Sequence, residues 1–209
     1  YILPIILFLL SLHVLHEMKS GVAHDEEVKS LYNKISGIER RIHAGEVTLI
    51  PPNDLVSHTR EMALKNRGDI WWFNICIGMF LSDSVFENVF RPAIENPNTK
   101  KIVPILREPF KEMWQEEVSA KIKRCKGSEK VEEPIWRDIK ENIAFTAIDL
   151  GEGDLKEADI SVWGEPFMAE YPIGETNVTK SVPRYLLHVK SDSELIYRLK
   201  DIFKKYSLK

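Results

Sequence analysis

From Val47 to Tyr206 the chain alternates between two hydrophobic periods, and this alternation restricts the fold more than any other feature. Apolar runs of strand length are predicted as strands at 47–50, 69–75, 101–106, 143–150, 159–168 and 185–190. Segments with apolar residues at three- and four-residue spacing are predicted as helices at 54–66, 84–92, 108–124 and 191–206. This order predicts an α/β domain whose mixed sheet is flanked by helices. The last three strands have no helix between them, which favours antiparallel or mixed pairing there.

Residues 1–45 have a different character and are predicted as a separate unit before an α/β domain at 46–209. Tyr1–Leu15 is apolar, but it is shorter than the roughly 20 residues that cross a bilayer. We expect the remainder of a membrane anchor; a helix buried in the core or in a dimer interface is the alternative. Lys19 and Lys29 then favour the cytoplasmic side for the domain.

A second helix is predicted between Asp25 and His43. Its apolar residues follow the spacing of a coiled-coil seam: Val28, Leu31, Ile35, Ile38 and Ile42. The pattern fits a stalk that pairs two chains, and it fits equally a single amphipathic helix packed on its own domain. A homodimer attached to a membrane is the expected assembly.

Composition and motifs exclude several classes of site. The 29 Lys and Arg residues and 32 Asp and Glu residues leave a formal charge of -3, so nucleic acid is not expected as a partner. Cys76 and Cys125 belong to no Cys/His cluster, and no glycine-rich phosphate loop is present. We therefore expect neither a metal nor a cofactor. His58, Glu61 and Lys65 share one helix face, which suits an exposed surface as well as an acid/base site.

The element order from Asp69 to Tyr206 resembles one half of the phospholipase D-like superfamily. Its active members carry His-x-Lys-x-x-x-x-Asp on one strand and a Gly-Ser-x-Asn element after the next. On the matching strand this chain has Asn142 and Ala144 where the family has its His and Lys, and it keeps only Asp149. The resemblance implies that the nucleophile and its cationic helper are missing.

The same resemblance implies a former catalytic cleft at these strand ends. Four residues are candidates for a ligand pocket there: Asn142, Asp149, Trp163 and Glu165. Core packing is the alternative for the tryptophan. His188-Val189-Lys190 also reads His-x-Lys, but its Asp position holds Leu195, so we interpret it as a strand end with exposed tips.

These observations predict a non-catalytic, membrane-anchored sensory or interaction module whose degenerate cleft binds a small molecule or a protein. The sensor domains of some transcriptional regulators resemble this arrangement. The alternative is a dimeric phosphodiesterase or nuclease of the phospholipase D-like type that uses His188 and Lys190.

Overall fold

The computed structural model describes residues 46–164, 167–172, 179–191 and 193–208. Backbone contacts divide the chain into Tyr1–Gly45 and Glu46–Lys209. The predicted apolar anchor and coiled-coil helix fall in the first unit and lie outside the described residues. In the part that is described, every helix is too short or too polar to cross a bilayer.

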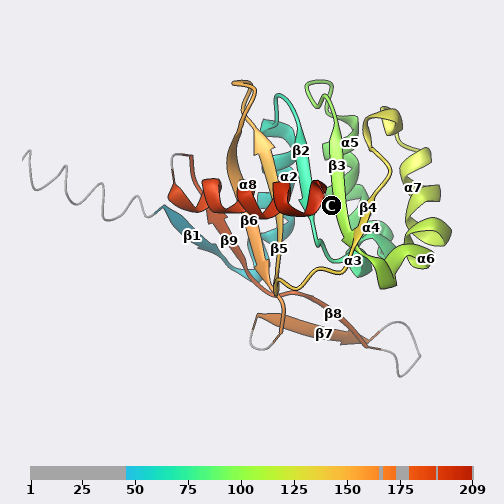
Figure 1. Cartoon of the computed structure of the whole chain (residues 1–209). Coiled ribbons are helices and arrows are strands. Elements are labelled where there is room, and N and C mark those ends of the chain that lie inside the picture. Colours follow the sequence, from blue (N-terminus) through green and yellow to red (C-terminus); the bar gives the residue numbers. More distant parts are fainter. Residues whose placement is uncertain (1–45, 165–166, 173–178, 192, 209) are drawn as a thin grey trace, which may run out of the picture. The chain divides into compact units, whose positions relative to one another are not determined.

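A seven-stranded mixed sheet forms the centre of the domain (Figure 1). Its strands follow the order β1 (Val47–Ile50), β9 (Leu186–Val189), β6 (Leu155–Val162), β5 (Ile143–Asp149), β2 (Ile70–Phe73), β3 (Ile102–Arg107) and β4 (Ile135–Arg137). Strands β2, β3 and β4 are parallel, whereas all other pairs are antiparallel. The predicted α/β class and the mixed sheet are confirmed.

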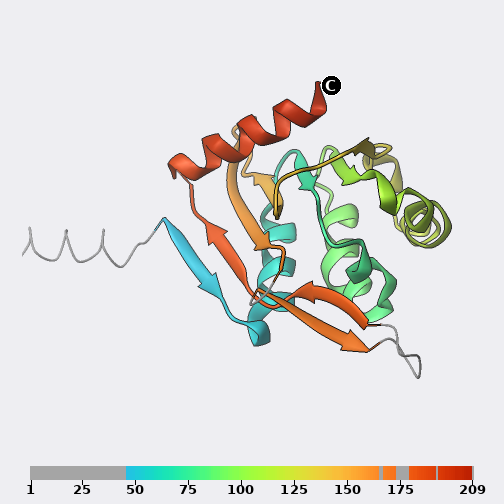
Figure 2. The same ribbon diagram turned by 60° about the horizontal axis from the view of Figure 1, so that its bottom comes forward.

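Helices cover both faces of this sheet. Helix α8 (Glu194–Ser207) crosses one face, and α2 (Leu55–Lys65) lies on the opposite one (Figure 2). The remaining helical segments are η1 (Pro52–Asp54), α3 (Ile77–Leu81), α4 (Asp83–Val85), η2 (Phe86–Phe90), α5 (Arg91–Glu95), η3 (Glu108–Phe110), α6 (Lys111–Met113), η4 (Trp114–Val118), α7 (Ser119–Lys123) and η5 (Ser128–Lys130).

The two layers of helices bury two hydrophobic cores. On the α8 side, Phe73 and Phe145 stack at 4.9 Å and pack with Phe203 of the helix. On the other side, Trp72 of β2 meets Phe80 and Phe90 edge-on. Neighbouring residues of β2 thus face opposite cores, which explains why the whole strand is apolar.

Strand β6 differs from the prediction of 159–168. It begins at Leu155 and ends at Val162, because Gly164 has a φ of 96° that ends the extended run. The chain then forms an unpredicted two-stranded hairpin, β7 (Met168–Pro172) and β8 (Thr179–Pro183), apart from the main sheet (Figure 1).

Two helices differ in their bounds from the prediction. The helix predicted from residue 84 begins with α4 at Asp83, and Ser82 caps it, since its side chain accepts a hydrogen bond from the amide of Val85. The helix predicted from residue 191 begins at Glu194, and Ser193 caps it by accepting a hydrogen bond from the amide of Leu195. The helix predicted to end at residue 92 continues to Glu95, and the π-helical segment η2 precedes Pro92.

Candidate functional site

Strand β6 carries polar side chains on the face of the sheet that lies under α2. Ala158 and Ile160 point into the core beneath α8. Because side chains alternate along a strand, Glu157, Asp159 and Ser161 point to the other face, and all three are buried. A buried carboxylate is costly unless it is paired, so this strand requires partners from α2 or from neighbouring strands.

Helix α2 supplies two of those partners. His58 and Lys65 are seven residues apart, which is about two turns, so both side chains lie on the same helix face. The Nε2 of His58 lies 2.9 Å from Oδ1 of Asp159. Lys65 Nζ donates to both carboxylate oxygens of Glu157, at 2.8 and 3.0 Å. The helix thereby neutralises one buried acid and hydrogen-bonds the other.

Strand β9 supplies the third partner. His188 is the cross-strand neighbour of Asp159, and its Nδ1 lies 2.9 Å from the same Oδ1 atom. Its Nε2 lies 3.9 Å from Oε2 of Glu157. The rings of His58 and His188 meet edge-on with their centroids 4.8 Å apart. We refer to His58, Asp159 and His188 as the His–Asp–His cluster.

The electrostatics of this cluster favour a charged carboxylate. Burial would raise the pKa of Asp159, but the hydrogen bonds from His188 and His58 outweigh it and hold that pKa below its ordinary value. The hydrogen bond to Asp159 raises the pKa of His58, against a smaller lowering by burial. Because an ionised carboxylate only accepts, both imidazoles donate to it.

A cavity of about 70 Å³ lies beside the cluster, between α2 and the sheet. Its wall is mainly apolar and includes Leu55, Val56, Thr59, Ile75, Cys76, Met79, Val89, Phe90, Ala144, Phe145, Thr146, Asp159, Ser161, Pro183 and Leu186. Asp159 is 3% exposed, and its Oδ2 atom is buried with no hydrogen-bond partner among the described residues. One oxygen of this carboxylate therefore serves the histidines, while the other is unpaired.

The predicted pocket residues do not all lie together. Asn142 is exposed just before β5, and its carbonyl accepts a hydrogen bond at 2.9 Å from the amide of Trp163, which follows β6. The Trp163 ring lies under the guanidinium of Arg107, 5.8 Å from its centroid. Glu165 lies outside the described residues.

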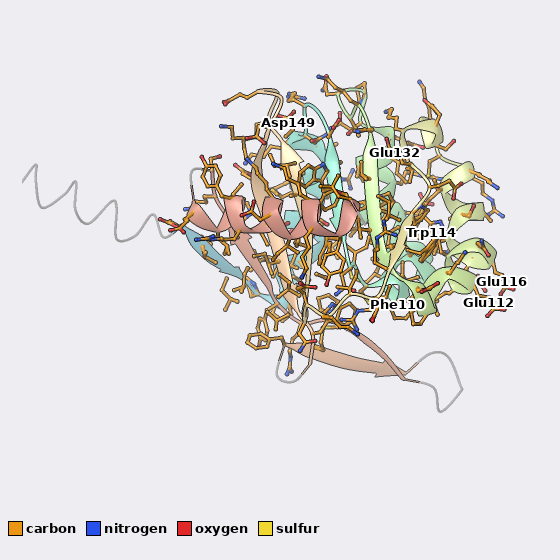
Figure 3. All side chains as sticks on the ribbon, in the orientation of Figure 1. Phe110, Glu112, Trp114, Glu116, Glu132 and Asp149 are labelled. Carbon is orange, nitrogen blue, oxygen red and sulfur yellow. The ribbon has the colours of Figure 1, made fainter. Side chains whose placement is uncertain are left out.

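Asp149 is at the opposite end of the seven-residue strand β5, roughly 20 Å from Asn142 at the rise of an extended chain. Figure 3 shows it at the end of the sheet away from the β7–β8 hairpin. Its Oδ1 accepts hydrogen bonds from the amides of Gly151 and Glu152, at 2.8 and 3.1 Å. The prediction of one pocket that includes Asp149 is corrected: this carboxylate orders a turn.

His188 was predicted to be an exposed strand tip, and this is wrong, since it is 9% exposed and belongs to the cluster. Lys190 follows β9, where its amide donates to the carbonyl of Glu46. Sequence reasoning missed Glu157 and Asp159. The signal was present as acids at alternate positions, separated by the apolar residues Ala158 and Ile160, a pattern that places both acids on one face of the sheet.

Comparison with known proteins gave no matching family model and no matching curated protein. Among solved structures, the chain is similar to TrmBL2, described as an archaeal chromatin protein with a novel mode of DNA binding. The TM-score is 0.44 at 12% identity, over 91% of this chain and 63% of that one. The chain thus spans less than two thirds of the matched chain.

The expected partners are corrected at this point. The expectation that nucleic acid is not a partner is not retained; the protein in the matched structure is described as DNA-binding. The expected homodimer and membrane contact gain no support and are not retained. A likeness at this TM-score carries no argument about function, and we transfer no DNA-binding property to this chain.

Proposed function

We propose that this chain is a non-catalytic binding module whose cavity beneath α2 takes a small ligand. The ligand has an apolar body and one hydrogen-bond donor, a hydroxyl or an ammonium group. The unpaired Oδ2 atom of Asp159 carries the proposal, because a buried acceptor without a partner costs about 1–3 kcal/mol and a ligand donor would recover it.

The wall of the cavity supports an apolar ligand body. Leu55 and Val56 come from α2, Phe90 from η2 and Leu186 from β9, so three separate elements contribute apolar side chains to it. Small-molecule sites typically combine such a lining with a few convergent polar groups. Here the hydroxyls of Thr59 and Ser161 accompany the carboxylate.

The lack of catalysis is supported by the resemblance to the phospholipase D-like superfamily. Ala144, at the position of that family's Lys, lines the cavity with a methyl group instead of a cation. Asn142, at the position of its nucleophile, cannot form a phosphoenzyme. The space left by the shorter side chain suits a bound ligand better than phosphorus chemistry.

The phosphodiesterase alternative through His188 and Lys190 is not carried forward. His188 is bonded to Asp159 and faces Glu157 at 3.9 Å. The carboxylate of Asp159 beside the nucleophile would repel a phosphate group.

The proposal is tested by the binding of three matched probes, benzyl alcohol, benzylamine and toluene, to the full chain. Binding is measured from changes in the amide chemical shifts. We expect one of the two donors to bind at least tenfold more tightly than toluene and to shift the amide signals of β5 and β6.

Ala144→Leu, which fills the cavity, should abolish binding, and Asp159→Asn should remove the preference for donors. Ala120→Leu, an equal enlargement at an exposed position of α7, is the control. Equal binding of toluene, or no binding of any probe, would overturn the proposal.

A further inference from the structure

We infer that the His–Asp–His cluster is a binding site for a divalent transition-metal ion of the zinc type. The inference rests on three side chains that converge from α2, β6 and β9. It does not depend on the ligand proposed for the neighbouring cavity.

The donor set suits such an ion. Imidazole nitrogens and a carboxylate oxygen are ordinary ligands of Zn²⁺, and sites with three protein ligands keep a position for water. The Nε2 of His58, the Nδ1 of His188 and a carboxylate oxygen of Asp159 lie within 4.8 Å of one another. Each histidine nitrogen is already 2.9 Å from Oδ1.

The closure that an ion requires is small. Ligand atoms at about 2.1 Å from a tetrahedral ion are about 3.4 Å apart, so the two nitrogens must approach each other by at most about 1.4 Å, and each must move about 0.5 Å away from Oδ1. His58 can make this movement, because it projects from a helix rather than a strand and its side chain is 17% exposed. His188 and Asp159 are held by the sheet.

The surroundings resemble those of metal sites. A metal-bound histidine commonly directs its second ring nitrogen to a carboxylate, which orients the ring. The Nε2 of His188 faces Glu157 at 3.9 Å, and Lys65 holds that carboxylate through two hydrogen bonds. The second acid is therefore neutralised, and Asp159 keeps one negative charge for the ion.

The unpaired Oδ2 of Asp159 is the second observation that points to a ligand. A purely structural hydrogen-bonded triad uses Oδ1 alone and leaves this atom buried without a partner. With an ion bound, either oxygen can coordinate, and the other can accept from a metal-bound water. Both oxygens then have partners.

Metal titration of the full chain, freed of metal with a chelator, tests the inference without any organic ligand. Zn²⁺ binding by calorimetry and the visible absorption of bound Co²⁺ are the readouts. We expect His58→Ala and His188→Gln each to weaken Zn²⁺ binding at least tenfold. Glu112→Gln, at an exposed position of α6, should leave it unchanged.

Histidines of the first 45 residues need their own control. A variant in which His13, His16, His24 and His43 are all replaced by alanine should keep the site. In the unaltered chain, nitrogen-15 spectra of the imidazoles should show His58 Nε2 and His188 Nδ1 binding Zn²⁺ and releasing their protons to solvent, a measurement that needs no variant to fold. Unchanged imidazole signals, or Zn²⁺ binding that survives both cluster variants, would overturn the inference. Probe binding measured with chelator present reports on the cavity alone, so failure of one proposal is distinguishable from failure of the other.

Discussion

His188 and Asp159 are direct cross-strand partners on β9 and β6, and a hydrogen bond of 2.9 Å joins their side chains. The register of the sheet fixes this pair, since a slip by one residue would turn one of the two side chains to the α8 side. His58 completes the cluster from a different element. The cluster therefore consists of a rigid pair and one adjustable member.

Removal of the adjustable member should destabilise the domain. His58→Ala takes away one of the two hydrogen bonds to Oδ1 of a buried charge, and we expect a loss of about 1–3 kcal/mol in the free energy of unfolding. Urea denaturation at neutral pH measures it. Arg60→Ala, at an exposed position of the same helix, should change stability by less than about 0.5 kcal/mol. Equal effects of the two variants would contradict the pairing.

Enlarging a side chain should affect stability differently on the two faces of β5. Ala144→Leu extends into the cavity, so we expect its melting temperature to stay close to that of the unaltered chain. Ala147→Leu, three residues on, enters the packed core beneath α8 and should cost about 1–3 kcal/mol. Thermal unfolding of both variants is the measurement, and a larger loss for Ala144→Leu would show that the cavity is not accessible to side-chain atoms.

Gly68 should not tolerate a methyl group. A Cβ atom at this position would lie 2.2 Å from Oδ2 of Asp149 and 2.9 Å from its Cβ, so Gly68→Ala must displace the turn that this carboxylate orders. We expect a loss of more than about 1 kcal/mol by chemical denaturation. Gly153→Ala provides the comparison, because its φ of 77° is strained for alanine but no atom lies within 4 Å. The comparison separates a steric clash from backbone strain.

The free energy of unfolding should depend on pH in the acid range because of Glu141. Burial raises the pKa of this carboxyl, but hydrogen bonds from Lys205 and Tyr206 of α8 outweigh it, and the net pKa is lowered. A lowered folded-state pKa means that stabilisation is present above the unfolded value of about 4.3 and is lost as the pH falls through the folded one.

We therefore expect Glu141→Gln to flatten the fall in stability between about pH 5 and pH 3. Urea midpoints of both proteins across this range measure it. Parallel curves for the two proteins would show that the contact with α8 contributes no proton linkage.

The sheet and its covering were largely predictable from the sequence. Strands β2, β3, β5 and β9 were found because each is an apolar run between turn residues. Strand β4 was missed, since three residues are too few to show a period. The internal strand β3 tolerates Pro104, because β4 pairs only with Ile105–Arg107 and leaves the proline without a partner on that side.

The cluster was less predictable, because it depends on register. His58 and His188 are 130 positions apart, and nothing in their local sequence pairs them. Asp159 lies within an apolar strand, where the acid was read as the first residue of the element rather than as its middle. The face that a strand residue occupies can be assigned only when the bounds of its strand are known. The positive φ of Gly164 makes β6 end earlier than predicted.

Strand β1 and helix α2 are joined by residues 51–54 alone. Thr48 of β1 lies opposite His188 in the antiparallel ladder with β9, and ten residues later the chain presents His58 from the helix. Mechanical tension applied at Glu46 would strain this ladder first. Separation of β1 from β9 would expose one edge of β9, which carries His188, and would pull on α2, which carries His58. Both imidazoles would then be displaced in the same event.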